Sequence, residues 1–150
     1  MAPTLAPLAP HRLEEARGLV GTAARPRELL ERIAGRGRET RAVGADDEAG
    51  ALSGLALYGD VAGSIGAGAV LWVGVRLDAR RRGVGRALVE WAVRELRDGG
   101  VRLVVTELPG SAQYAGALAL FAACGFRGEG EIADFYRDGV PLLLLGHRHG

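Results

Sequence analysis

Three consecutive arginines, Arg80 to Arg82, stand directly before two glycines one residue apart, Gly83 and Gly85. Apolar residues then recur at helical spacing, which predicts a helix over 84–97. The first turn of a helix has unpaired N–H groups and partial positive charge, and glycines let a phosphate approach the backbone. The stretch therefore predicts an anion site, in which arginine side chains add forked donors for phosphate oxygens.

Two common phosphate motifs do not fit this stretch. A Walker loop ends in Lys and Ser or Thr, and the chain contains no Lys. A dinucleotide-binding fingerprint needs a third glycine, but position 88 is Leu. What remains is R-x-x-G-x-G at Arg80, Gly83 and Gly85, preceded by a predicted strand.

The composition is that of an ordinary globular protein, with 150 residues, 48% hydrophobic and 25% charged. We expect a single domain over 1–150. The net charge of +1 argues against a nucleic-acid binder. The single cysteine, Cys124, favours a reducing compartment and reads as a small buried hydrophobe. With no signal peptide and no apolar run of membrane-spanning length, we expect a cytoplasmic protein without membrane contact.

The remaining pattern predicts an α/β protein in which one mixed sheet has helices on both faces. An edge strand begins near Thr4, and two short helices, split by Gly21 and Pro26, follow it. A further helix is expected over 111–124, capped by Ser111 and Gly125. The runs 69–77 and 101–108 are apolar enough to predict burial on both faces. The remaining strands are expected at 39–46, 51–59, 126–136 and 140–148.

Two blocks resemble the GNAT-superfamily N-acetyltransferases. The family pattern V-x-P-x-x-[QR]-x-x-G-x-[GA] is met by Val75, Leu77, Arg80, Gly83 and Gly85. The second block is a helix ending in an aromatic, then Gly-Phe and a hairpin, here "ALALFAACGF" and "IADFYRDG". The resemblance covers about residues 40 to 148. It implies a GNAT-like, largely antiparallel central sheet with a splay between two central strands.

The resemblance also implies acetyl-CoA, or another acyl-CoA, as acyl donor, and no metal. The pyrophosphate would lie on the amides of residues 81 to 86. The pantetheine arm would pair with Val75 and Leu77 like an added strand, and the N–H of Val75 would polarise the thioester as an oxyanion donor. The implied cofactor-binding residues are Val75, Leu77, Arg80, Arg81, Arg82, Gly83, Val84, Gly85, Arg86 and Phe121.

The match departs from the family at three positions. Leu77 replaces a frequent Pro, and Tyr114 replaces a frequent Asn. Phe121 stands where many members have the Tyr that protonates the departing thiolate, so either another group or water must do so. Tyr114 lies seven residues earlier, about 10 Å along a helix, where it could line the acceptor pocket or touch CoA.

Glu107 is the candidate catalytic base, because it ends the strand beside the splay, where a crevice forms. The alternative is a carboxylate that merely ends a strand in solvent. Tyr136 and Asp134, before the last turn, could reach the acceptor; the alternative is a hairpin aromatic and a solvated acid. His147 and His149 have same-face spacing but no visible third ligand, so we read them as a frayed tail and not a metal site.

These observations predict an N-acetyltransferase, an acyltransferase transferring groups other than aminoacyl groups, that acts by direct attack. The acceptor would be a primary amine of a small molecule, amino acid or peptide. The alternative, motivated by Phe121, is a non-catalytic acyl-CoA-binding or regulatory module. A third hypothesis, an arginine-based grip on acidic polymer, conflicts with the net charge. The segment "VPLLLLG" would be an exposed apolar edge if unpaired, which favours a homodimer through the C-terminal strands.

Overall fold

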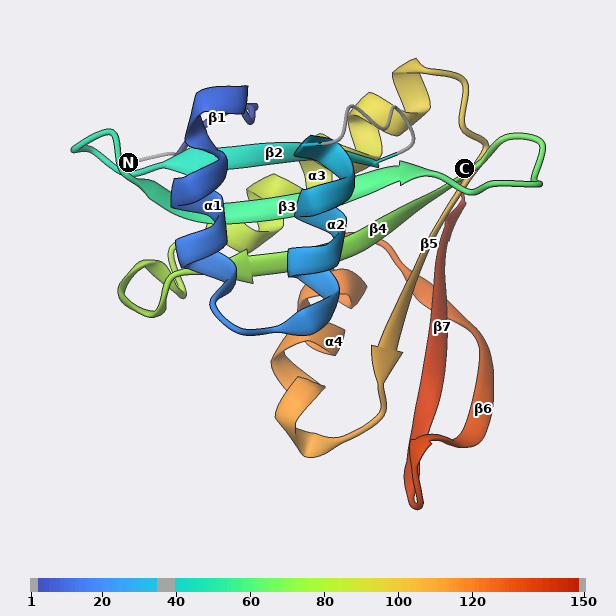
Figure 1. Cartoon of the computed structure of the whole chain (residues 1–150). Helices are drawn as coiled ribbons and strands as arrows, with labels where there is room; N and C mark the ends of the chain where they lie inside the picture. Colours follow the sequence, from blue (N-terminus) through green and yellow to red (C-terminus); the bar gives the residue numbers. More distant parts are fainter. Residues whose placement is uncertain (1–2, 35–39, 149–150) are drawn as a thin grey trace.

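Seven strands form one mixed sheet in the computed structural model, which describes residues 3–34 and 40–148. The order across the sheet is β1-β2-β3-β4-β5-β7-β6, and every neighbouring pair is antiparallel except β4 and β5 (Figure 1). The predicted mixed, largely antiparallel sheet is confirmed. The strands are β1 (Thr4–Pro7), β2 (Thr40–Asp46), β3 (Leu52–Asp60), β4 (Ala67–Val75), β5 (Leu103–Pro109), β6 (Arg127–Arg137) and β7 (Val140–Arg148).

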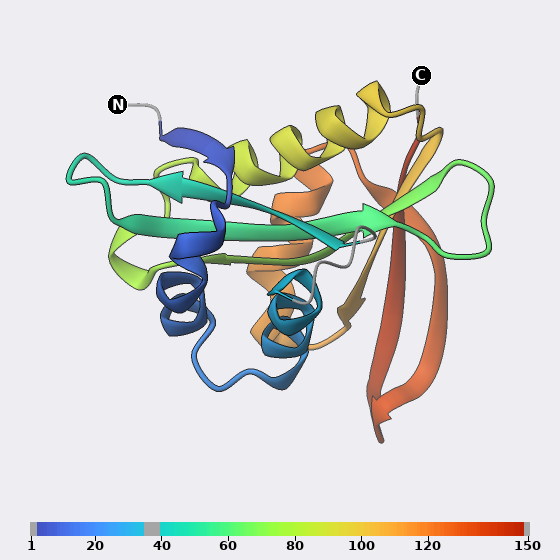
Figure 2. The ribbon, with the colours of Figure 1, turned by 45° about the horizontal axis from the view of Figure 1, so that its top comes forward.

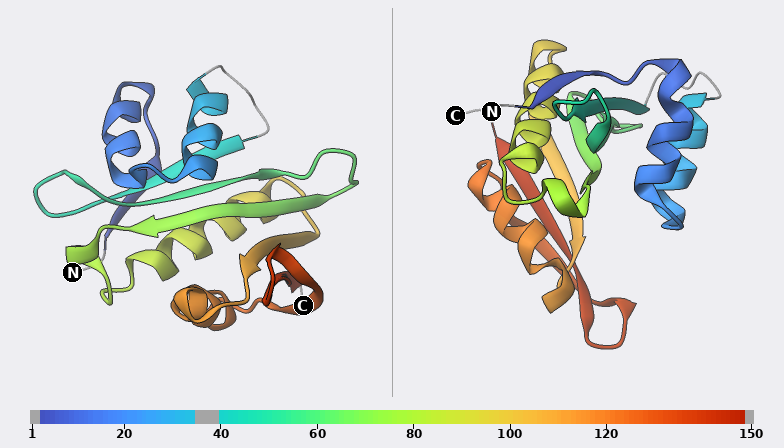
Figure 3. Two further views of the ribbon diagram at one scale, coloured as in Figure 1. Left: turned by 60° about the horizontal axis from the view of Figure 1, so that its bottom comes forward. Right: turned by 90° about the vertical axis from the view of Figure 1, so that its left-hand side faces the viewer.

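Helices cover both faces of the sheet, as predicted (Figure 3). α1 (Leu13–Val20) and α2 (Ala24–Ala34) pack on one face, and α3 (Val84–Asp98) and α4 (Ala115–Ala123) pack on the other. Each face has its own apolar core, and α3 supplies the longest buried stripe, which includes Leu88 and Leu96. Within the described ranges, no helix combines the length and the apolar character that crossing a membrane requires.

Several strands and helices begin or end at other residues than predicted. β4 ends at Val75, two residues early, so Leu77 lies in a short 3-10 turn, η2 (Leu77–Ala79), and is 78% exposed. The helix expected from Ser111 opens as a 3-10 turn, η3 (Ala112–Tyr114), and the Ser111 side chain makes no capping hydrogen bond. Glu39 and His149, which also carried predictions, fall outside the described residues.

The central feature of the sheet is the separation of β4 from β5. The two strands pair only through Ala67 with Leu103, Gly68 with Val104 and Ala69 with Val105. Beyond these pairs β4 continues beside β3, while β5 continues beside β7, and the two halves of the sheet run in different directions (Figure 2). The first carbonyl beyond the paired region, that of Val70, accepts a hydrogen bond of 2.8 Å from the Thr106 hydroxyl. The implied splay is therefore present.

This separation explains why two burial predictions are wrong. β4 was expected to be buried on both faces, but its second half is only half-buried because β5 has moved away from it. β5 alternates instead: Val104, Thr106 and Leu108 face the α3 and α4 core, and Glu107 between them is exposed. Only the paired parts of the central strands behave as a doubly covered sheet.

The apolar strand "VPLLLLG" is not an edge. β7 pairs with β5 on one side and with β6 on the other, so its backbone is satisfied within the chain. The true edge at this end is β6, whose residues are all exposed. The reasoning that β7 needs a second copy is therefore wrong, and the homodimer stays a prediction without this support.

Replacing Thr106 with Val should destabilise the fold, because the hydroxyl is lost and the buried Val70 carbonyl is left unpaired. We expect a loss of about 1–3 kcal/mol in the free energy of unfolding, measured by urea denaturation. The same substitution at Thr40 is a matched control, because Thr40 is a buried residue whose hydroxyl makes no hydrogen bond with a described residue. Equal losses in T106V and T40V would contradict the role given to the Thr106–Val70 bond.

Candidate functional site

The loop between β4 and α3 has the backbone geometry of an anion site. Arg81 and Gly83 both adopt left-handed conformations, with φ of 61° and 80°. Residues of this kind turn successive N–H groups toward one side, which makes a concave nest for anions. Gly83 is the N-cap of α3, no side chain caps this end, and no acidic residue lies in the first turn. The N–H groups there are available, and the helix dipole favours a negative ligand.

The two glycines of the motif have different roles. Gly83 has open space around it, so it is needed for its positive φ and not for fit. Gly85 has ordinary helical geometry, but a Cβ there would lie 3.2 Å from Cδ2 of Leu120 on α4. One glycine shapes the nest, and the other lets α3 approach α4.

The arginines around the loop are not equivalent, although the sequence placed them together. Arg80 is folded back, and its Nε donates to the Val75 carbonyl at 3.0 Å. Arg86 pairs with Glu90 on α3, at 2.6 Å. Arg81 and Arg82 are exposed and make no hydrogen bond or ion pair with any residue in the described ranges. The pair left available for an external anion is therefore Arg81 and Arg82.

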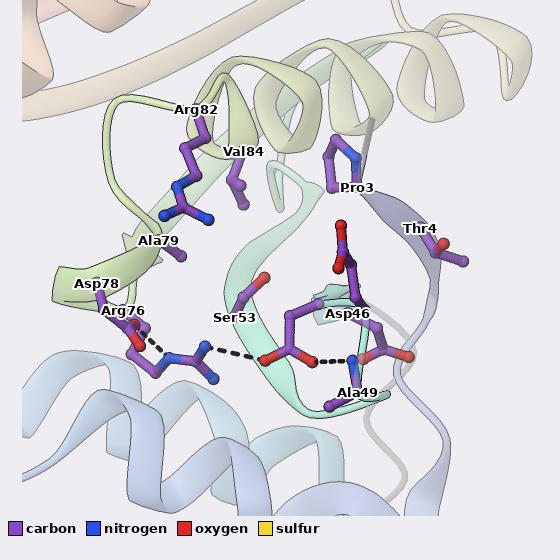
Figure 4. A pocket seen from close by; sticks show the side chains of 12 residues that line it. Pro3, Thr4, Asp46, Ala49, Ser53, Arg76, Asp78, Ala79, Arg82 and Val84 are labelled. Carbon is purple, nitrogen blue, oxygen red and sulfur yellow. Dashed lines mark hydrogen bonds and ion pairs between the residues drawn. The ribbon is translucent and has the colours of Figure 1, made fainter. Parts of the chain in front are cut away.

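Arg76 fixes the loop to the neighbouring turn. Its guanidinium bridges Asp78 at 2.5 Å and Asp47 at 2.9 Å, and it also donates to the Leu52 carbonyl (Figure 4). The hydrogen bond from Arg76 holds the pKa of Asp47 below its usual range, followed by a backbone hydrogen bond from Ala51. The adjacent cavity, about 700 Å³, is lined by the acidic residues Asp46, Asp47, Glu48 and Asp78 and also by Arg76 and Arg82 (Figure 4). The four acidic residues outnumber the two arginines, which makes this cavity unfavourable for a phosphate.

The end of β4 offers main-chain groups toward the gap left by β5. The N–H of Arg76 donates to the Ser53 carbonyl of β3 at 2.8 Å. Along an antiparallel strand, every second residue directs its N–H and carbonyl toward the partner strand. The N–H and carbonyl groups of Val75 and Val73 therefore point away from β3, toward the gap. A second cavity, about 350 Å³, lies at this strand end and includes Val75, Leu77 and Arg80. This alternation adds Val73 to the residues whose main chain faces the gap, and the sequence analysis had not named it.

A second group of residues meets at the end of β5. Glu107 is exposed on the face away from the α3 and α4 core, and Tyr136 on β6 and Tyr114 in η3 belong to the same neighbourhood. Burial raises the pKa of the Tyr136 phenol first, and the negative charge of Glu107 raises it further. The positive charge of Arg25, from the first turn of α2, lowers it. Glu107, Tyr114 and Arg25 are thus within electrostatic reach of the Tyr136 phenol, and the roles predicted for Glu107, Tyr114 and Tyr136 stay predictions.

A bulge in β6 presents Tyr136. Pairing with β7 stops after Ile132 and resumes at Arg137. Within the gap Asp134 has a φ of 55°, and its carboxylate accepts a 2.7 Å hydrogen bond from the Gly139 N–H. Asp134 is therefore a part of the hairpin architecture. The bulge exposes Phe135 and Tyr136, whose rings meet edge to face at 5.0 Å.

Three other predicted residues have mainly structural surroundings. Phe121 is buried and packs edge to face on Phe126 at 5.1 Å, so its predicted contact with a cofactor stays a prediction. Cys124 is half-buried, and burial raises the pKa of its thiol, which keeps it protonated. The frayed-tail prediction is wrong for His147, which lies in β7 and contacts Arg97 through its ring and its carbonyl.

Solved structures with a similar fold are numerous. A GNAT-family protein from Desulfovibrio desulfuricans superposes with a TM-score of 0.89 at 24% identity, covering 98% of this chain and 99% of that one. A GNAT superfamily phosphinothricin acetyltransferase from Sinorhizobium meliloti, in complex with AcCoA, gives 0.82 at 20% identity, with 100% and 90% covered. The ribosomal-protein-S18-alanine N-acetyltransferase from Escherichia coli gives 0.80 at 19%, with 98% and 94% covered.

The sequence itself carries the family signal. No protein in a comparison with curated sequences matches the chain. The family model described as Acetyltransferase (GNAT) family matches residues 10–126, a range that includes the nest, the open edge of β4 and Glu107. The chain therefore belongs to the GNAT family of acetyltransferases.

Proposed function

We propose that this protein transfers an acetyl group from acetyl-CoA to a primary amine. The observation that carries the proposal is the uncapped N-terminus of α3, with its left-handed nest, beside an open edge of β4. A diphosphate fits the first feature, and an amide-bearing chain fits the second. The AcCoA held by the Sinorhizobium meliloti neighbour contains both.

The donor would be held mostly by main-chain groups. The amides of residues 81 to 86 take the pyrophosphate, and Arg81 and Arg82 add charge from the side. The pantetheine arm pairs with the free edge at Val73 and Val75, in the way that a missing strand would. Leu77 is no longer in the strand, so its predicted pairing is replaced by that of Val73. The N–H of Val75 remains our candidate for polarising the thioester carbonyl.

Glu107 would take a proton from the acceptor ammonium, directly or through water. The amine nitrogen then attacks the thioester carbon and the new C–N bond forms. The nitrogen releases its second proton to water, and the C–S bond breaks as CoA leaves as a thiolate. Phe121 has no proton to give, so we assign the protonation of the thiolate to water. Tyr136 keeps its proton at neutral pH, as an ordinary phenol does, and the upward direction of its pKa only adds to this, so it can donate a hydrogen bond to the acceptor.

Acetyl-CoA and free CoA should both raise the melting temperature, while ATP should not. A ligand present at about 100 times its dissociation constant adds roughly 2.7 kcal/mol, which corresponds to a shift of about 5 to 10 °C here. Differential scanning fluorimetry measures it directly. If neither CoA species shifts the melting temperature, the nest is not a pyrophosphate site and the proposal fails.

Replacing Gly83 with Ala should weaken acetyl-CoA binding about tenfold, because an L side chain disfavours the positive φ that shapes the nest. Isothermal titration calorimetry would compare it with Gly116→Ala. Gly116 lies in α4 with open space around it and without a positive φ, so Ala is tolerated there and affinity should be unchanged. Wild-type affinity in G83A would show that the backbone cradle does not hold the donor.

Replacing Glu107 with Gln should lower kcat/KM for the amine by 10²- to 10⁴-fold, because the base is lost, while acetyl-CoA affinity is kept. The assay follows release of the CoA thiol with a panel of primary amines. Glu28→Gln is the control, since Glu28 is an exposed carboxylate paired with Arg32 on α2. Binding of acetyl-CoA without turnover of any amine would instead favour the non-catalytic acyl-CoA-binding module.

A further inference from the structure

One face of the sheet beyond the splay lies outside both apolar cores of the described residues. Side chains alternate between the faces of a strand, and residues opposed on neighbouring strands share a face. Alternate residues of β5 face the α3 and α4 core, so Glu107 and Pro109 face the other side, together with their β7 partners Leu144 and Leu142. Leu142 in turn opposes Ile132 of β6. None of these five residues belongs to either core.

Within the paired stretches 103–109, 130–132 and 142–146, Glu107 is the one charged residue on this face. Its companions there are apolar: Leu103, Val105, Pro109, Gly130, Ile132, Leu142, Leu144 and Gly146. We call the part formed by Glu107, Leu144, Leu142 and Ile132 the open strip. It places a single carboxylate beside a continuous apolar surface.

Charged residues resume at the two ends of this surface. At one end Arg127 opposes Gly146, and the Glu129 carboxylate lies over the same glycine and pairs with Arg148 at 2.9 Å. At the other end Arg137 follows the bulge in β6. A ligand on the open strip itself therefore meets Glu107 and otherwise apolar side chains.

The open strip is accessible where a ligand would need it. Glu107 is exposed, Leu144 is half-buried and Ile132 is 55% exposed, while the buried Leu142 forms the floor between them. The spacing of strands and residues places the Cα atoms of Glu107 and Ile132 about 12 Å apart, diagonally across β7. An alkyl chain that begins at Glu107 can therefore run over Leu144 and Leu142 toward Ile132.

We infer that the acetyl acceptor is an apolar primary amine, whose single charge is the ammonium that becomes acetylated. Glu107 receives the ammonium, and Leu144, Leu142 and Ile132 contact the alkyl or aryl body. A second charge on the acceptor, whether a carboxylate or another ammonium, would lie against leucine side chains without a partner, which is unfavourable. This inference rests on the proposed function and narrows its acceptor class.

The test uses acceptors that differ in apolar length or in one added charge. Ethylamine, butylamine and hexylamine vary the length, 1,4-diaminobutane adds an ammonium to butylamine, and phenylalanine adds a carboxylate to phenethylamine. Full burial of one CH₂ corresponds to about a fourfold change. On this partly exposed face we expect kcat/KM for hexylamine to exceed that for ethylamine at least tenfold. Each added charge should lower kcat/KM at least tenfold.

Ile132→Ser tests the open strip directly, at an exposed position where a polar residue does not disturb a core. It should lower the ratio of kcat/KM for hexylamine to that for ethylamine at least threefold. Ile65→Ser is the matched control, because Ile65 is an exposed isoleucine in the β3–β4 loop, and it should keep the wild-type ratio. A flat length series in the wild type, a preference for the acceptors with two charges, or an unchanged ratio in I132S would overturn the inference while leaving an acetyltransferase in place.

A binding measurement separates the inference from the proposed function. Calorimetric titration of hexylamine and ethylamine into the CoA-loaded protein reports binding without turnover. Binding of hexylamine that weakens in I132S, with no acetyl transfer, would support the acceptor class and contradict the catalytic proposal. If hexylamine neither binds nor reacts, the inference is wrong.

Sedimentation velocity tests the competing occupant of the open strip, a second copy of this chain. We expect the wild type and I132S to have the same oligomeric state. A wild-type dimer that becomes a monomer in I132S would show that the strip is an interface between copies, and the inference would fail.

Discussion

The parting of β4 and β5 after three residue pairs is the constraint on which the rest of the site depends. Two parallel central strands would normally bond along their whole length, and a gap between them leaves main-chain groups without partners. Thr106 covers the first of these groups with its hydroxyl, and Arg80 covers the carbonyl of Val75. Between them the N–H and carbonyl of Val73 and the N–H of Val75 face the gap, and this edge is where an extended ligand can bind.

The two halves of the site rest on different kinds of groups. On the proposed donor side the main chain would do most of the binding, through the nest at residues 81 to 83 and the edge of β4. The arginine at position 76 holds this loop against the β2–β3 turn, so the shape of the nest is tied to the sheet. On the acceptor side the groups are side chains, and they come from α2, β5, η3 and β6. In this proposal the donor half would recognise its ligand mainly through backbone shape, and the acceptor half through side chains.

The loop and helix start that we propose for the donor could be located from the sequence because their signals are local. A strand, Arg80, Gly83, Gly85 and an apolar stripe all fall within about twenty residues, and each has a direct backbone meaning. The strand end at Val75 was missed, because Leu77 is as apolar as a strand residue and only the departure of β5 shows where the strand stops. β7 was mistaken for an edge for a similar reason, since pairing with two distant strands leaves no trace in its own sequence.

The acceptor half was only partly predictable. Glu107 and Tyr136 stand out as polar residues beside predicted strand ends, but Arg25 is one arginine among many in an arginine-rich chain. Its positive charge acts on Tyr136 of β6, which is about a hundred residues away in sequence. A pattern within one short stretch of sequence cannot show that α2 and β6 lie near each other in the fold.

The bulge in β6 has a consequence for how such a site changes over time. Between the pairs Ile132–Leu142 and Arg137–Val140, β6 advances five residues while β7 advances two. Side chains alternate between the faces of a strand, so loss or gain of one residue here would turn Phe135 and Tyr136 to the opposite face. The edge position of β6 lets the sheet tolerate such a length change. Insertions and deletions in this hairpin, more than substitutions, are therefore the short route by which a descendant of this protein would acquire a different acceptor while keeping its donor.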